Sequence, residues 1–157
     1  MRFGVQMYNG WRFLHVLGAL GFLAAHGTTA AVALRLRRER DPAKIRLLLG
    51  LSRSTRPWMS ISLLLLFVAG VTAGFQGHWW DSGWIWTSLI LLIVLLVAAF
   101  PLAVPYYVRV RRAVAEGSET PPEELASLLR SPRPIVIAVT ETLGLIVIVW
   151  LMVLKPF

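Results

Sequence analysis

The sequence predicts an all-α membrane protein, a bundle of four transmembrane helices that forms a single membrane domain over residues 1–157. Two features of composition predict this class: 57% of the residues are hydrophobic, with a mean hydropathy of +0.67, and only 15% are charged. Soluble domains carry about 25% charged residues. A third observation, four apolar stretches long enough to cross a bilayer, gives the number of helices.

Each predicted span meets the length that a bilayer requires, which is roughly 20 apolar helical residues. The four spans are residues 11–34, 58–77, 83–108 and 134–154. The first follows Arg2 and could be a signal peptide, but its apolar run exceeds the roughly 7 to 15 residues of a signal core. We therefore expect it to be a true span. Spans two and four each follow a basic loop, and span three follows a short connection.

Basic residues are concentrated in two loops, residues 35–57 with eight Lys and Arg and residues 109–133 with five, and only three lie elsewhere. Positive residues mark the cytoplasmic side of a membrane protein. We therefore expect both loops inside and both termini outside, in a multi-pass protein of the inner (cytoplasmic) membrane. Six of the seven tryptophans then fall at the outer interface. Because topology accounts for the net charge of +8, we expect the lipid bilayer as partner and no nucleic acid.

The two basic loops share a pattern. Spans one and three are both followed by R-x-R-R, and spans two and four both begin after R-S-x-R-P. We expect two tandem helical hairpins related by a pseudo-twofold axis along the membrane normal; the alternative is chance convergence of two basic loops. The short amphipathic stretches 42–51 and 121–129 are expected at the inner headgroup surface.

Three ionisable residues lie at bilayer depth: His15, His26 and Glu141. A charged residue near the bilayer centre costs about 2.5 to 3.5 kcal/mol, so each is a candidate site. His15 and His26 are eleven residues apart, close to three turns, and Glu141 and Met152 repeat that spacing in span four. The depths match in pairs if spans one and four are neighbours. We therefore expect His26 to contact Glu141 and His15 to face Met152.

Each of these residues also has a purely structural interpretation. A contact between His26 and Glu141 can serve only to hold two helices together. Met152 can be a packing residue, His15 can reach toward the headgroups, and His78 suits an interfacial surface position. The sequence contains no Walker loop, dinucleotide-binding loop, zinc-protease motif or matched Ser, His and acid set. With no cysteine, thiolate metal sites and disulfides are excluded, and enzyme activity is left open.

The stretch from Trp11 to Ala19, W-R-F-L-H-V-L-G-A, resembles the start of the first helix in four-helix membrane proteins related to the CopD copper-resistance membrane domain. This loose group includes uncharacterised predicted integral membrane proteins, which the chain resembles most over its whole length, and a haem-binding protoporphyrinogen oxidase. The resemblance implies a four-helix membrane fold. It also implies that His15 is a haem or metal ligand.

The first functional hypothesis is a membrane protein that binds haem b or a metal ion for electron transfer or cofactor handling. His15 would be one axial ligand and Met152 or His78 the other, and Arg12, three residues before His15, would hold a haem propionate.

Two other functions remain open. One is a proton-coupled transporter of small solutes that acts as a homodimer, with Glu141 as the protonatable carboxylate and His26 as its partner. The other is a non-catalytic subunit that packs against a larger membrane complex through spans two and three.

Overall fold

The computed structural model describes residues 2–115 and 121–157, and this part of the chain is helical, with no strand. Four helices are long and apolar enough to cross a membrane, which confirms the predicted all-α fold with four spans. The helices are α1 (Arg2–Leu36), α2 (Pro42–Gln76), α3 (Gly83–Ala113), α4 (Pro122–Leu129) and α5 (Arg133–Leu154).

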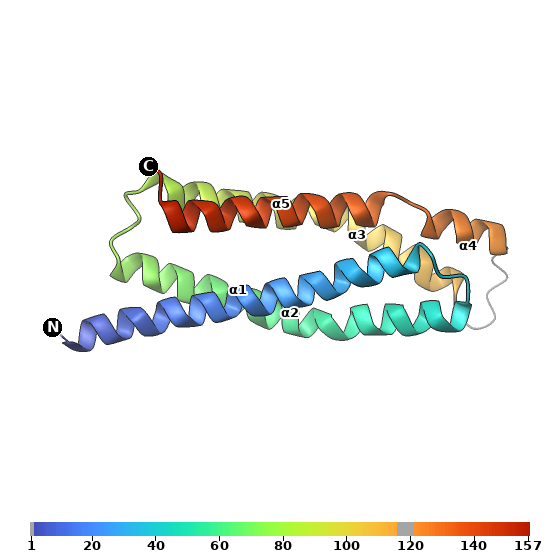
Figure 1. The fold of residues 1–157 in the computed structure, drawn as a ribbon, viewed down its shortest axis with the longest axis horizontal. Helices are drawn as coiled ribbons and strands as arrows, with labels where there is room; N and C mark the ends of the chain where they lie inside the picture. Colours follow the sequence, from blue (N-terminus) through green and yellow to red (C-terminus); the bar gives the residue numbers. More distant parts are fainter. Residues whose placement is uncertain (1, 116–120) are drawn as a thin grey trace.

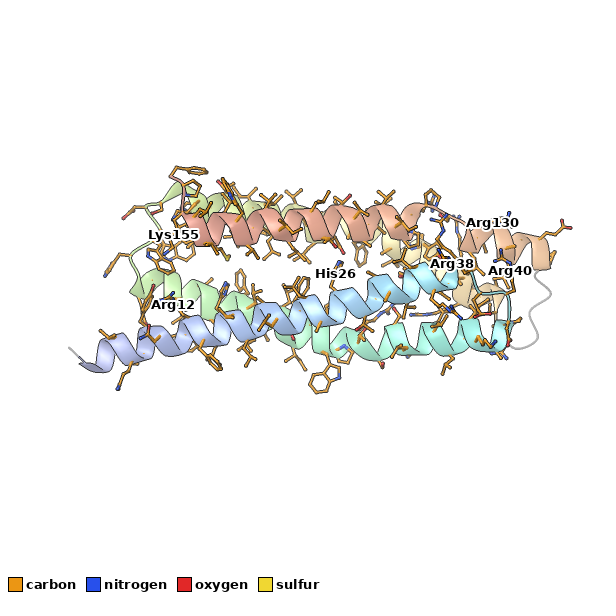
Figure 2. All side chains as sticks on the ribbon, in the orientation of Figure 1. Arg12, His26, Arg38, Arg40, Arg130 and Lys155 are labelled. Atoms are coloured by element: carbon orange, nitrogen blue, oxygen red, sulfur yellow. The ribbon has the colours of Figure 1, made fainter. Side chains whose placement is uncertain are left out.

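The long helices form two antiparallel hairpins, α1 with α2 and α3 with α5, which lie side by side (Figure 1). The two hairpins meet chiefly where α1 contacts α5, as expected if spans one and four are neighbours. Both termini lie at one end of the bundle, together with the α2–α3 connection (Figure 1). Because that connection carries Trp79 and Trp80, we call this the tryptophan end. The opposite end holds Arg38, Arg40 and Arg130 and is called the basic end (Figure 2).

Small residues allow the helices of each hairpin to approach closely. A Cβ atom added to Gly18 would lie 2.6 Å from the backbone nitrogen of Leu66, and one added to Gly21 would lie 2.5 Å from the Ser62 hydroxyl oxygen. In the second hairpin, a Cβ on Gly144 would overlap the side chain of Leu95. In lipid there is no hydrophobic driving force between helices, so close packing of this kind stabilises their association.

The two basic loops fold differently, which corrects one expectation. Residues 42–51 are not a separate surface helix but the first turns of α2, whose start is capped by the Asp41 carboxylate accepting from the backbone N–H of Ala43 (2.9 Å). In the second loop α4 ends at Leu129 and α5 begins separately at Arg133. The pseudo-twofold axis stays a prediction, and residues 116–120 of the loop 109–133 lie outside the described residues.

A proline explains this difference between the loops. The segment R-S-T-R-P lies within α2 as continuous helix, whereas the helix is interrupted at R-S-P-R-P, between α4 and α5. Pro132 stands where the first loop has Thr55. Proline removes a backbone donor and disfavours the helical conformation of the residue before it. Pro57 holds the same position in the first loop as Pro134 does in the second, and it lies inside α2.

Each end of the bundle has a packed cluster. At the basic end the core includes Leu36, Ile45, Val110 and Leu129, all at most 1% exposed. At the tryptophan end the chain closes on itself, because the backbone N–H of Trp84 donates to the Phe157 carbonyl (3.2 Å) and the Lys155 ammonium lies 3.9 Å from the centre of the Trp79 ring. These clusters leave the middle of the bundle, between the hairpins, as the region where a site can form.

Candidate functional site

His26 and Glu141 meet between the two hairpins. Nδ1 of His26 on α1 lies 3.1 Å from Oε2 of Glu141 on α5, which is hydrogen-bonding distance. The two side chains are 12% and 19% exposed. Figure 2 shows His26 in the space between α1 and α5. The structure thus brings together the two residues whose equal depth the basic boundaries indicated.

The other ring nitrogen of His26 is left without a partner. Nε2 is buried and makes no hydrogen bond within residues 2–115 and 121–157. The ring stacks on Phe22, one turn earlier on α1, with centroids 6.2 Å apart and planes within 10°. Buried polar atoms are nearly always hydrogen-bonded, so an unpartnered one needs an explanation such as water, an ion or a ligand.

His26 and Glu141 also line a cavity of about 450 Å³ between the hairpins. All four long helices contribute to its wall, which is mostly apolar. The volume lies within the range of about 300 to 1,000 Å³ typical of small-molecule sites. Besides His26 and Glu141, the polar residues that line it are Thr29, Ser52, Arg56, Ser60, Tyr107 and Arg111.

Positive charge dominates the cavity wall near the basic end. Arg56 is exposed and Arg111 is half-buried, and the charges of Arg53 and Arg56 act repulsively on Arg111. Nη2 of Arg111 is buried and has no hydrogen-bond partner in the part of the chain that the structure describes. Glu141 is the one carboxylate among the described lining residues. A guanidinium without an acceptor in such a wall is a ready donor to an anion.

Sequence reasoning missed these arginines because a basic residue beside a span is interpreted first as a topology signal. A periodic signal was available. Ser52, Arg56 and Ser60 recur every four residues on α2, and Tyr107 and Arg111 have the same spacing on α3. Residues four apart lie on one face of a helix, so a polar row of this kind indicates a shared wall.

His15 packs against α2 instead of facing Met152 on α5, where the matching depths would have put it. Its Nδ1 lies 2.8 Å from the Leu66 carbonyl oxygen. The ring fills the notch at Gly70, where an added Cβ would come within 2.7 Å of Nδ1. Gly70 therefore leaves room for the imidazole because it has no side chain, and His15 links the two helices of the first hairpin.

The remaining candidates are Arg12, His78 and Met152. The Arg12 guanidinium lies 5.4 Å from the centre of the Tyr8 ring. His78 is exposed in the α2–α3 connection with a positive φ of 54°, and Met152 is half-buried on α5. Among the described residues, no hydrogen bond joins these three to His15, and no group of three His, Cys, Asp or Glu is placed to hold a metal ion.

The donor set therefore fits haem only in part. If Nδ1 of His15 carries the proton and donates to the Leu66 carbonyl, Nε2 keeps its lone pair for iron, which is the usual arrangement of a histidine ligand. In the described part of the chain, the polar contact of His15 is with Leu66, and it makes no hydrogen bond to Met152 or His78.

A family model described as a predicted integral membrane protein (DUF2269) matches residues 11–156, which is nearly the whole chain. No curated protein and no solved structure matches.

Proposed function

We propose that this chain, which belongs to the DUF2269 family of predicted integral membrane proteins, moves a small solute across the membrane together with protons. The observation that carries the proposal is the contact between His26 and Glu141 on the wall of a cavity between the hairpins. Ionisable residues inside the membrane are rare, and in transporters they form proton relays. The pair supplies a proton site beside a space of solute size.

The number of protons on the pair sets its charge. The pair is neutral when imidazolium faces carboxylate, or when imidazole faces carboxylic acid. One more proton makes it positive, and one fewer makes it negative, so the protons belong to the pair and not to either residue. Each step changes the charge of the cavity wall by one unit. A charged solute in the cavity therefore binds in a way that depends on the proton count, which is the coupling that transport requires.

Other charged or titratable groups face the same space from the neighbouring helices: Arg56 on α2, and Tyr107 and Arg111 on α3. Guanidinium groups keep their charge across the range in which histidine and carboxylate titrate. In the cavity wall, His26 and Glu141 are therefore the residues to which we assign the exchange of protons.

We further propose that two copies act together and that the basic end faces the cytoplasm. Four helices are few for an alternating-access pathway. In addition, only 6% of the most apolar stretch of α3 is buried within one copy, which leaves this helix free to pack against a second copy. The eight and five basic residues of the two loops support the cytoplasmic placement. Light scattering of the protein in detergent measures the first point, and a monomer would refute it.

Proton binding is tested by infrared difference spectroscopy of the purified protein in acidic against neutral buffer. We expect a carboxylic acid signal that disappears in Glu141→Gln and changes in His26→Gln, because the two residues share protons. Glu124→Gln, which removes an exposed carboxylate of α4, is the matched control and should leave that signal in place. A spectrum that is the same in wild type and Glu141→Gln would refute the proton site.

A second candidate function is haem b binding through His15, favoured by the hydrogen-bonding distance between its Nδ1 and the Leu66 carbonyl. Expression with a haem precursor, followed by a reduced-minus-oxidised spectrum of wild type and His15→Ala, tests it. A b-type spectrum that His15→Ala abolishes would support haem. A flat spectrum from folded wild-type protein would rule this function out.

A further inference from the structure

We propose that the cavity binds an amphiphilic anion, with its anionic head at Arg56 and Arg111 and its apolar tail extending along the bundle toward Phe22. This inference rests on the proposed function, since it names the class of solute that the proton site would accompany. The shared chemistry is one negative head group on a hydrocarbon tail, whether it comes from a free carboxylate or from a membrane lipid.

The cavity is elongated along the helix axes. Its wall on α1 runs from Phe22 to Ala33, eleven residues, which at 1.5 Å per residue is roughly 16 Å. On α3 the wall runs from Leu96 to Arg111, roughly 22 Å by the same rise. A volume of about 450 Å³ drawn out over such a length suits a chain-like molecule.

The two ends of this space differ in chemistry. Toward the basic end lie Arg56, Tyr107 and Arg111, and further along the axis the wall is lined by Phe22, Leu63 and Leu96. Apolar surface receives a tail at about 25 cal/mol for each Å² taken out of water. The guanidinium group of Arg111, a residue of the cavity wall whose Nη2 has no partner among the described residues, receives the head, because guanidinium donors recognise carboxylate and phosphate with two parallel hydrogen bonds. A cationic head would be repelled by the two arginines, and a neutral head would accept a hydrogen bond without compensating their charge.

The proton pair lies along the same space and responds to the charge of the ligand. Glu141 as a carboxylate repels an anion, and its repulsion is removed when a proton is added to the pair. Anion binding and proton binding therefore favour each other, and by linkage the anion binds more tightly in acidic buffer. Arg56 and Arg111 give the binding its charge requirement, and His26 with Glu141 give it its pH dependence.

The experiment measures binding of radiolabelled decanoate to the full-length protein in a neutral detergent, by scintillation proximity, with decanol as the uncharged competitor. We expect decanoate to bind and decanol to compete weakly. Arg111→Gln and Arg56→Gln should each weaken decanoate binding by roughly tenfold or more, since each removes a charge-assisted contact. Arg109→Gln is the matched control, because Arg109 is an exposed arginine of α3 outside the cavity wall, and it should change binding less than about twofold.

Several outcomes decide the matter. Equal decanoate binding in wild type and in Arg111→Gln, or an equal loss in Arg109→Gln, would overturn the anion site. If Arg111→Gln does not fold, as judged by gel filtration, Arg111→Lys serves instead: it keeps the charge without the two-pronged geometry and should bind with intermediate affinity. A second arm adds phosphatidylglycerol or phosphatidylcholine as competitor. Displacement of decanoate by phosphatidylglycerol alone identifies a lipid as the source, and displacement by neither identifies a free amphiphile.

Measuring decanoate binding over a series of pH values separates this inference from the proposed function. If decanoate binding depends on Arg111 but has the same pH profile in wild type and Glu141→Gln, the anion site stands and proton coupling fails. If Glu141 titrates in the infrared experiment but decanoate does not bind, proton coupling stands and the anion site fails.

Discussion

The coupling between His26 and Glu141 can be measured by a double-mutant cycle. The perturbations are His26→Ala, Glu141→Ala and the two combined. Glu141→Ala removes the only partner of the imidazole among the described residues, so both ring nitrogens become buried and unpaired. Leaving a buried polar group unsatisfied costs about 1 to 3 kcal/mol. We therefore expect each single variant to lose about 2 kcal/mol of unfolding free energy.

The double variant should lose less than the sum of the single losses. Interhelical hydrogen bonds in membranes contribute about 0.6 kcal/mol on average and about 1.7 kcal/mol at most. The 3.1 Å distance and the partial burial of both side chains place this pair near the upper value. We expect a coupling free energy of about 1 to 2 kcal/mol, since neither partner is left alone in the double variant.

The assay is unfolding in sodium dodecyl sulfate, followed by tryptophan fluorescence, because the chain has seven tryptophans. The matched control is the cycle of His15→Ala with Glu141→Ala: His15 is also a histidine of α1, but its contacts are with α2. Those effects should add to within about 0.5 kcal/mol. A coupling for His26 no larger than that of the control would refute the reasoning.

Three other predictions concern the fold. Gly70→Ala should destabilise the protein by about 1 to 3 kcal/mol because the new Cβ would meet the His15 ring, whereas Gly27→Ala, with open space around it, should be neutral or stabilising; thermal unfolding compares them, and equal effects would contradict the packing. A reporter fused after Trp80 should be active on the outer side of the membrane, and a cytoplasmic signal there would overturn the topology. Backbone N–H groups of the next two residues hold the pKa of Glu39 below its ordinary value, so any stability from this carboxylate is present at neutral pH and is lost as the pH falls through that lowered pKa; an NMR titration midpoint at or above the ordinary value would contradict this.

The four spans could be predicted from the sequence because length and hydropathy are local properties, and the bilayer fixes both. Helix ends were less predictable. The first stretch of α2 is amphipathic, as a surface helix would be, yet R-S-T-R-P stays helical with Pro57 inside it, so the span and its loop form one helix. The second loop differs by Pro132, and comparing the two loops at that position would have revealed the break.

The sequence predicts how deep each candidate residue lies in the membrane. It does not predict how each helix is rotated about its axis, which decides the neighbour that a side chain faces. Counting from the basic boundaries put Glu141 and His26 at one level, and the structure has them in contact. The same counting paired His15 with Met152, but equal depth does not say which neighbour a side chain faces. The glycine at position 70 of α2 decided that, by making room for the ring. The sequence did not identify Arg111 as a residue of the cavity wall, because that role depends on which helices surround it.

The glycine contacts of the first hairpin bear on the order in which the protein is made. Chains are synthesised from the N-terminus, and the close approach of α1 to α2 at Gly18 and Gly21 involves no residue of the second hairpin. The first hairpin can therefore assemble in the bilayer before α3 leaves the ribosome. At that stage His26 on α1 still lacks its partner on α5. Glu141, the acid that arrives last, is inserted next to a base already in place, so the costliest residue of the chain never has to cross the membrane without a partner.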